Sequence, residues 1–178
     1  IYKNQFLESQ RIFDNGIKLI KKHANQVVPD ILFYQAMPYI YLNQNKKATL
    51  YLNTIKNMDK SAWVLISNAY RLLINGDLGK GNKIVEELKR MNIPDSEMKY
   101  RFSHFYILLN DKEKALKALD EAVDGGFFCY NYIKSDPLTE KIHNEPRFKQ
   151  IVEKAKLRHE LYKKRFGDEI RSLLGTTS

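Results

Sequence analysis

The sequence predicts an all-α fold, a right-handed α-α superhelix of stacked helix pairs with a helical C-terminal cap. Only 8 glycines and 5 prolines occur among 178 residues, which favours helices over strands. Small and large apolar residues also recur in the same order in three successive segments, which is typical of a solenoid. We expect one domain with a leading helix, three helix pairs and capping helices over residues 1–28, 29–59, 60–95, 96–129 and 130–178.

The leading helix is predicted from apolar side chains that recur at helical spacing along residues 1–28. The three helix pairs are predicted from a repeated order of residue types. In each pair a small residue precedes a tyrosine by three positions, and a second small residue lies near the start of the next helix. The three sets are Ala36, Tyr39 and Ala48; Ser67, Tyr70 and Gly81; Ser103, Tyr106 and Ala115. The second small residue recurs at nearly even intervals, at positions 48, 81 and 115.

The middle pair carries the most characteristic motif. Trp63, Ile66, Ser67 and Tyr70 match the pattern W-x2-L-G-x2-Y, with Ile for Leu and Ser for Gly. With the spacing of the three sets, which is about 34 residues, this motif makes residues 30–126 resemble the tetratricopeptide repeat (TPR) family. The resemblance implies a TPR-like solenoid of helix-turn-helix units and a non-enzymatic role in protein–protein interaction.

Two features depart from a regular helical repeat. Pro38 lies inside the first helix of its pair, where it removes a backbone donor, and we expect a kink there. Gly79 and Gly81 lie at the start of a second helix, where each weakens the helix by about 1 kcal/mol relative to alanine.

The C-terminal segment is predicted to cover the end of the solenoid. Asp136 can cap a short helix that starts at Pro137, and a long final helix follows. The string DPLTEKIHNEPRFKQIVEKA resembles the ending that follows TPR arrays in bacterial multidomain regulators. This resemblance implies a sensor or scaffold part of a larger bacterial signalling or transcription regulator. Because the sequence begins at Ile1 rather than Met, we expect it to be a fragment or a processed product.

The first helix of each pair lines the concave face of a TPR superhelix, so a partner-binding groove is expected there. Its large apolar and aromatic side chains suit an amphipathic helix or an extended apolar peptide. The expected groove residues are Phe33, Met37, Tyr41, Val64, Asn68, Arg71, Tyr100 and His104. An equally weighted alternative is that the chain's own terminal helices fill this groove.

One groove residue matches a known peptide clamp. Asn68 corresponds to the asparagine with which chaperone-binding TPR proteins hold a peptide carboxylate. The lysines that complete that clamp are replaced by Phe33, Val64 and Tyr100. The resemblance therefore does not extend to chaperone binding.

We find no catalytic, metal-binding or cofactor-binding motif in the sequence, so a non-enzymatic protein without a cofactor is predicted. The segment Gly76–Gly81 lacks the spacing of a phosphate-binding loop and is predicted to be a turn. Cys129 is the single cysteine, which fits a cytoplasmic protein, and it is predicted to be an inert packed thiol.

The charge leaves an alternative function open. The net charge is +9, of which residues 1–60 carry +5 and residues 127–178 carry +4. The alternative is a nucleic-acid-binding module that uses the basic N- and C-terminal helices. A solvated lysine-rich surface explains the same charge. A homodimer is a further alternative, and no apolar run is long enough to span a membrane.

Overall fold

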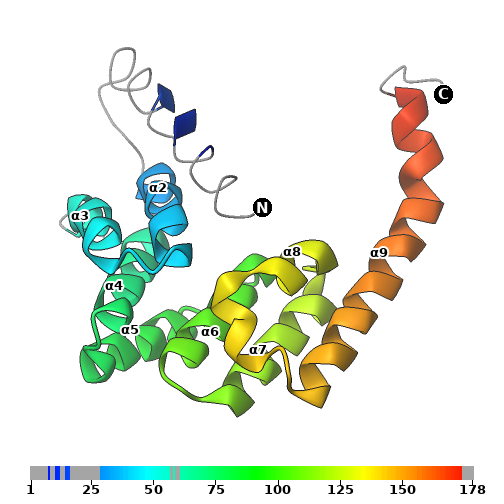
Figure 1. Cartoon of the computed structure of the whole chain (residues 1–178). Coiled ribbons are helices and arrows are strands. Elements are labelled where there is room, and N and C mark those ends of the chain that lie inside the picture. The colour runs from blue at the N-terminus through cyan, green and yellow to red at the C-terminus, as the bar shows by residue number, and fades with distance from the viewer. Residues whose placement is uncertain are drawn as a thin grey trace. The chain divides into compact units, whose positions relative to one another are not determined.

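A computed structural model describes residues 29–56, 58 and 61–173, together with residues 8, 11, 12, 15 and 16. Most of the predicted leading helix therefore lies outside the described residues. Contacts within the chain divide it into two compact units, residues 1–93 and 94–178. Every regular element in the described part is a helix, which confirms the all-α prediction (Figure 1).

The three predicted helix pairs are present. In the first unit they are formed by α2 (Pro29–Tyr41) with α3 (Asn45–Ile55) and by α4 (Ala62–Ile74) with α5 (Leu78–Arg90). In the second unit α6 (Ser96–Leu108) pairs with α7 (Lys112–Gly125), and α8 (Tyr130–Ser135), the 3₁₀ helix η1 (Pro137–Ile142) and α9 (Pro146–Leu173) follow. Helix α2 continues through Pro38 to its end, and the kink expected at Pro38 stays a prediction.

The same turn joins the two helices of each pair. It places Asn43, Gly76 and Asn110 in the left-handed region, with φ of 55°, 81° and 60°. The next residue in each turn donates its backbone N–H to a carbonyl five residues earlier, at 2.8, 3.0 and 2.8 Å. The left-handed residues lie at nearly even intervals along the chain, at positions 43, 76 and 110. The chain therefore repeats one helical hairpin three times.

Small residues lie where the two helices of each hairpin meet. All six predicted small residues are buried, and so are Tyr39, Tyr70 and Tyr106. The hydroxyls of Ser67 and Ser103 donate to backbone carbonyls of their own helices, at 2.7 and 2.6 Å. These hydroxyls are therefore satisfied inside the core. Buried small residues, buried tyrosines and a repeated turn together make the fold TPR-like.

The glycines of α5 give a matched test of this close packing. A Cβ on Gly81 would collide with the buried side chain of Leu73, whose Cγ would lie 2.7 Å away, whereas a Cβ on Gly79 would meet nothing within 4 Å. Gly81→Ala is therefore expected to lower the free energy of unfolding by about 1–3 kcal/mol. Gly79→Ala is expected to raise it by up to about 1 kcal/mol, because alanine favours the helix. Urea unfolding of both variants checks this, and equal shifts would contradict close packing at Gly81.

Candidate functional site

The predicted groove residues of the first unit separate into buried and accessible ones. Phe33, Met37 and Val64 are buried, and the Phe33 ring lies 5.5 Å from Trp63 and 5.4 Å from Tyr70. These three side chains therefore contribute to the core between α2 and α4. The accessible groove residues of this unit are Tyr41, Asn68 and Arg71, each of which is half-buried.

Asn68 and Arg71 form a polar pair on α4. The Nη2 of Arg71 donates to the Oδ1 of Asn68 at 3.3 Å, as expected for residues three apart on one helix. The Arg71 Nε is buried and has no hydrogen-bond partner in the described part of the chain. The side chain as a whole is half-buried, and a guanidinium that stays partly accessible suits a carboxylate.

The predicted groove residues of the second unit lie beneath the chain's own C-terminal segment. Tyr100 and His104 are both fully buried on α6. The Tyr100 ring stacks on Phe127 at 4.5 Å and lies 5.7 Å from Tyr132, and both of these residues follow α7. A partner would reach Tyr100 and His104 only if this segment moved away.

Asp136 binds both of these α6 side chains. The Tyr100 hydroxyl donates to Asp136 Oδ2 at 2.7 Å, and His104 Nε2 lies 3.0 Å from the same oxygen. The other oxygen, Oδ1, accepts the backbone N–H of Leu138 at 2.8 Å, so Asp136 also caps η1 as predicted. Only this capping role is predictable from the sequence, because nothing in the residue spacing connects Asp136 with side chains more than 30 residues earlier.

Burial and polar contacts have opposite effects on the pKa of Asp136. Burial raises the pKa of its carboxyl, but electrostatic attraction to His104 and hydrogen bonds from His104 and Tyr100 lower it. The net pKa lies below the ordinary value, so the carboxylate is the favoured form in the fold. Asp136, Tyr100 and His104 therefore act as a buried clasp that holds η1 on α6. We refer to these three residues as the cap clasp.

Two further side chains support η1. The Thr139 hydroxyl contacts the carbonyls of Ile133 and Asp136 at 3.1 and 2.9 Å and lies 2.9 Å from His143 Nε2. The His143 ring stacks on Phe148 at 4.6 Å. Burial lowers the pKa of His143, although the charges of Glu140 and Asp136 act against it. Neutral His143 is thus part of the packing beneath α9.

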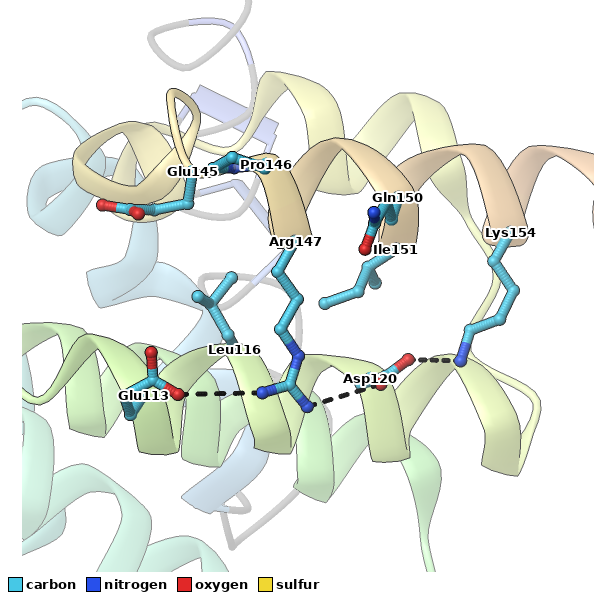
Figure 2. A pocket seen from close by; sticks show the side chains of 9 residues that line it. All are labelled: Glu113, Leu116, Asp120, Glu145, Pro146, Arg147, Gln150, Ile151 and Lys154. Carbon is cyan, nitrogen blue, oxygen red and sulfur yellow. Dashed lines mark hydrogen bonds and ion pairs between the residues drawn. The ribbon is translucent and has the colours of Figure 1, made fainter.

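An open cleft of about 580 Å³ lies between α7 and the first half of α9 (Figure 2). Figure 2 shows Arg147 between Glu113 and Asp120, with Lys154 on the other side of Asp120. The guanidinium of Arg147 lies 3.8 Å from Glu113 and 3.6 Å from Asp120, and Lys154 also pairs with Asp120. Leu116 and Ile151 provide the buried apolar part of its lining. The acidic and basic groups of the cleft are thus largely neutralised within it.

Burial lowers the pKa of Lys154, but hydrogen bonds and charges from Asp120 and Asp124 outweigh it and raise the pKa. This lysine therefore stays protonated and holds α9 on α7.

Three features of the described residues bear on chemistry: possible metal ligands, the segment Gly76–Gly81 and Cys129. Among the described residues, no group of three or more His, Cys, Asp or Glu side chains could hold a metal ion. Gly76 lies in the hairpin turn and Asp77 caps α5, so the segment Gly76–Gly81 is a turn and a helix start, as predicted. The prediction of a packed Cys129 is wrong. Its side chain is exposed, in the segment between α7 and α8, whereas its neighbours Phe128 and Tyr130 are half-buried.

No protein-family model matches the chain, and no curated protein matches it. A solved structure described as "Crystal structure of MamA" is similar at a TM-score of 0.47 and 15% identity, over 92% of this chain and 94% of that chain. The fold assignment therefore rests on the repeated hairpins. In the described residues, no helix is long and apolar enough to cross a membrane.

Proposed function

We propose that the chain is a non-enzymatic protein-interaction module. The observation that carries this proposal is the repetition of one hairpin turn at nearly even intervals, at Asn43, Gly76 and Asn110. Stacked hairpins present an extended surface that suits a peptide or a helix of another protein. The resemblance of the C-terminal string to bacterial regulators supports a sensor or scaffold role in a larger cytoplasmic signalling or transcription protein.

The surface that we propose for the partner in the first unit is the accessible part of the predicted groove. Tyr41, Asn68 and Arg71 are half-buried, so each keeps part of its side chain available. The Asn68–Arg71 pair offers donors for a carboxylate, and the Tyr41 ring offers an apolar contact. We therefore expect the partner to present an acidic residue beside an apolar one.

Peptides selected from a displayed random library against the wild-type chain provide the test. Asn68→Ala combined with Arg71→Ala is expected to weaken the selected peptides by about tenfold or more, because charge-assisted hydrogen bonds are lost. Fluorescence anisotropy measures the affinity, and a control variant, Lys83→Ala, changes an exposed residue of α5. The Lys83→Ala control should bind the peptides as the wild type does. If the variant with Asn68→Ala and Arg71→Ala also binds them as the wild type does, the groove proposal is wrong.

The alternative is nucleic-acid binding through α9. Exposed side chains that favour it include Lys156, Lys163, Lys164 and Arg165. Binding of this kind weakens steeply as salt rises, because phosphate contacts release counterions. Anisotropy of labelled single-stranded RNA and duplex DNA at low salt tests it, and an unchanged signal would remove this alternative.

A further inference from the structure

From the second unit, we infer that the cleft between α7 and α9 and the exposed leucines of α9 form one docking surface for an acidic amphipathic helix of a partner protein. This inference rests on the proposed interaction role but not on the Asn68–Arg71 pair. The docking surface consists of the cleft, Leu157 and Leu161, with Lys164 and Arg165 at its basic end.

Helix α9 has apolar side chains on two opposite sides. Phe148, Ile151 and Ala155 are buried against the rest of the unit. Leu157 lies nine residues after Phe148, which is about two and a half helical turns, so it lies on the opposite side. Leu157 and Leu161 are four residues apart on that side, and they are 64% and 62% exposed. These two exposed leucines, one helical turn apart, form a small apolar patch.

The leucines continue the line of the cleft. Gln150 lines the cleft and lies seven residues, or about two turns, before Leu157. Gln150, Leu157 and Leu161 therefore lie along one side of α9 over roughly 16 Å. This length matches about three turns of a second helix, which would place successive apolar residues over the leucines and in the cleft. Figure 1 shows α9 continuing beyond α7 and α8.

The charges around the docking surface determine which kind of partner helix it accepts. The acidic groups of the cleft already have partners, since Asp120 pairs with Arg147 and Lys154. Lys164 and Arg165 lie on the turn after Leu161, where they outnumber the exposed carboxylate of Glu160. Within the described part neither basic side chain lies in an ion pair with a carboxylate. A partner with glutamates or aspartates beside its apolar stripe would complement this basic end.

Other occupants fit the surface less well. A second copy of the chain would bring its own Lys164 and Arg165 into the same interface, where like charges repel. A nucleic acid would use the basic groups but would gain little from two leucines. An anionic bilayer would accept the leucines and lysines, but its flat surface would leave the cleft unfilled.

The test uses the full chain and two labelled peptides of about 18 residues, a length that permits a stable helix. Both peptides carry the same leucine stripe, flanked in one by glutamate and in the other by lysine. The acidic peptide is expected to bind at least about tenfold more tightly in an anisotropy titration. Equal binding of the two peptides, or no binding of either up to about 1 mM, would overturn the proposal.

Variants of the exposed leucines and of the basic end show where on α9 the acidic peptide binds. Leu157→Ser combined with Leu161→Ser should weaken the acidic peptide at least about tenfold, whereas Leu50→Ser should not, although Leu50 on α3 is 67% exposed. Lys164→Glu combined with Arg165→Glu should favour the basic peptide. Since all these residues are exposed, the melting temperatures should stay the same. If the leucine variant binds like the wild type, the docking surface is wrong.

Further arms separate this inference from the other proposals. Asn68→Ala with Arg71→Ala should leave unchanged the part of acidic-peptide binding that depends on Leu157 and Leu161, so each surface is tested independently of the other. Light scattering should give the same mass for the wild type and the leucine variant. A lower mass for the variant would make a second copy the occupant and overturn the proposal. Leucine-dependent binding to single-stranded RNA or to phosphatidylserine vesicles, without binding to the acidic peptide, would likewise overturn it.

Discussion

Replacing Asp136 by alanine is expected to lower the free energy of unfolding of residues 94–178 by about 3–5 kcal/mol. The reason is the cap clasp, in which a single carboxylate oxygen lies 2.7 Å from the Tyr100 hydroxyl and 3.0 Å from His104 Nε2. The variant leaves both groups buried without their acidic partner, which costs more than the loss of an exposed contact. It also removes the N-terminal cap of η1.

Hydrogen exchange with mass spectrometry measures this effect within the second unit. Peptides that cover α8 and η1 should exchange faster in Asp136→Ala, because the clasp no longer holds η1 on α6. Asp136→Asn keeps the shape and one acceptor oxygen, so it should lie between the wild type and the alanine variant. If these peptides exchange at the same rate in Asp136→Ala as in the wild type, the clasp contributes nothing to holding η1.

The free energy of unfolding is expected to depend on pH because of the same Asp136 carboxylate. The pKa of Asp136 is lowered in the fold, so its contribution is present above the unfolded pKa of about 3.8 and is lost as pH falls through the lower folded pKa. The lowered pKa of His143 acts in the same direction, but its contribution starts to fall near its unfolded pKa of about 6.5. Urea unfolding from pH 7 to pH 2 should therefore show a steeper loss in the wild type than in Asp136→Asn below about pH 4.

The hairpins could be predicted from the sequence because their determinants are local and repeated. The small residues that lie where α2, α4 and α6 meet their partner helices occur at the predicted positions, and their nearly even spacing recurs in the turns. Asp111 is one example, because it directly follows the turn residue Asn110 and its side chain caps the N-terminus of α7. Such signals require only the period of the helix and the preferences of turn residues.

The cap clasp could not be predicted in the same way. Asp136 lies 36 residues from Tyr100, so their contact depends on how η1 returns to α6 and not on a local pattern. The exposure of Cys129 was missed for a similar reason, since aromatic neighbours in the sequence do not determine which side chains of the segment between α7 and α8 face solvent. The groove residues show a third limit, because helical phase alone does not separate buried Phe33 from accessible Asn68.

Replacing Phe33 by alanine is expected to lower the free energy of unfolding of the first unit by about 3–5 kcal/mol. The Phe33 side chain is fully buried, and its ring lies within 5.5 Å of the Tyr34, Trp63 and Tyr70 rings. Removing it leaves a cavity between α2 and α4, and aromatic contacts beyond simple burial are also lost. Trp63 is the single tryptophan of the chain, so its fluorescence during urea unfolding reports on this site.

Tyr41→Ala provides the comparison, since Tyr41 lies at the end of the same helix and is only half-buried. If Phe33 belongs to the core, its variant should lower the midpoint of unfolding far more than the Tyr41 variant does. If Phe33 instead serves a partner in the groove, Phe33→Ala should leave the midpoint nearly unchanged and reduce peptide binding. The two results distinguish a core residue from a binding residue. Removing a core side chain lowers the free energy of unfolding, whereas removing a binding side chain lowers the affinity for the peptide.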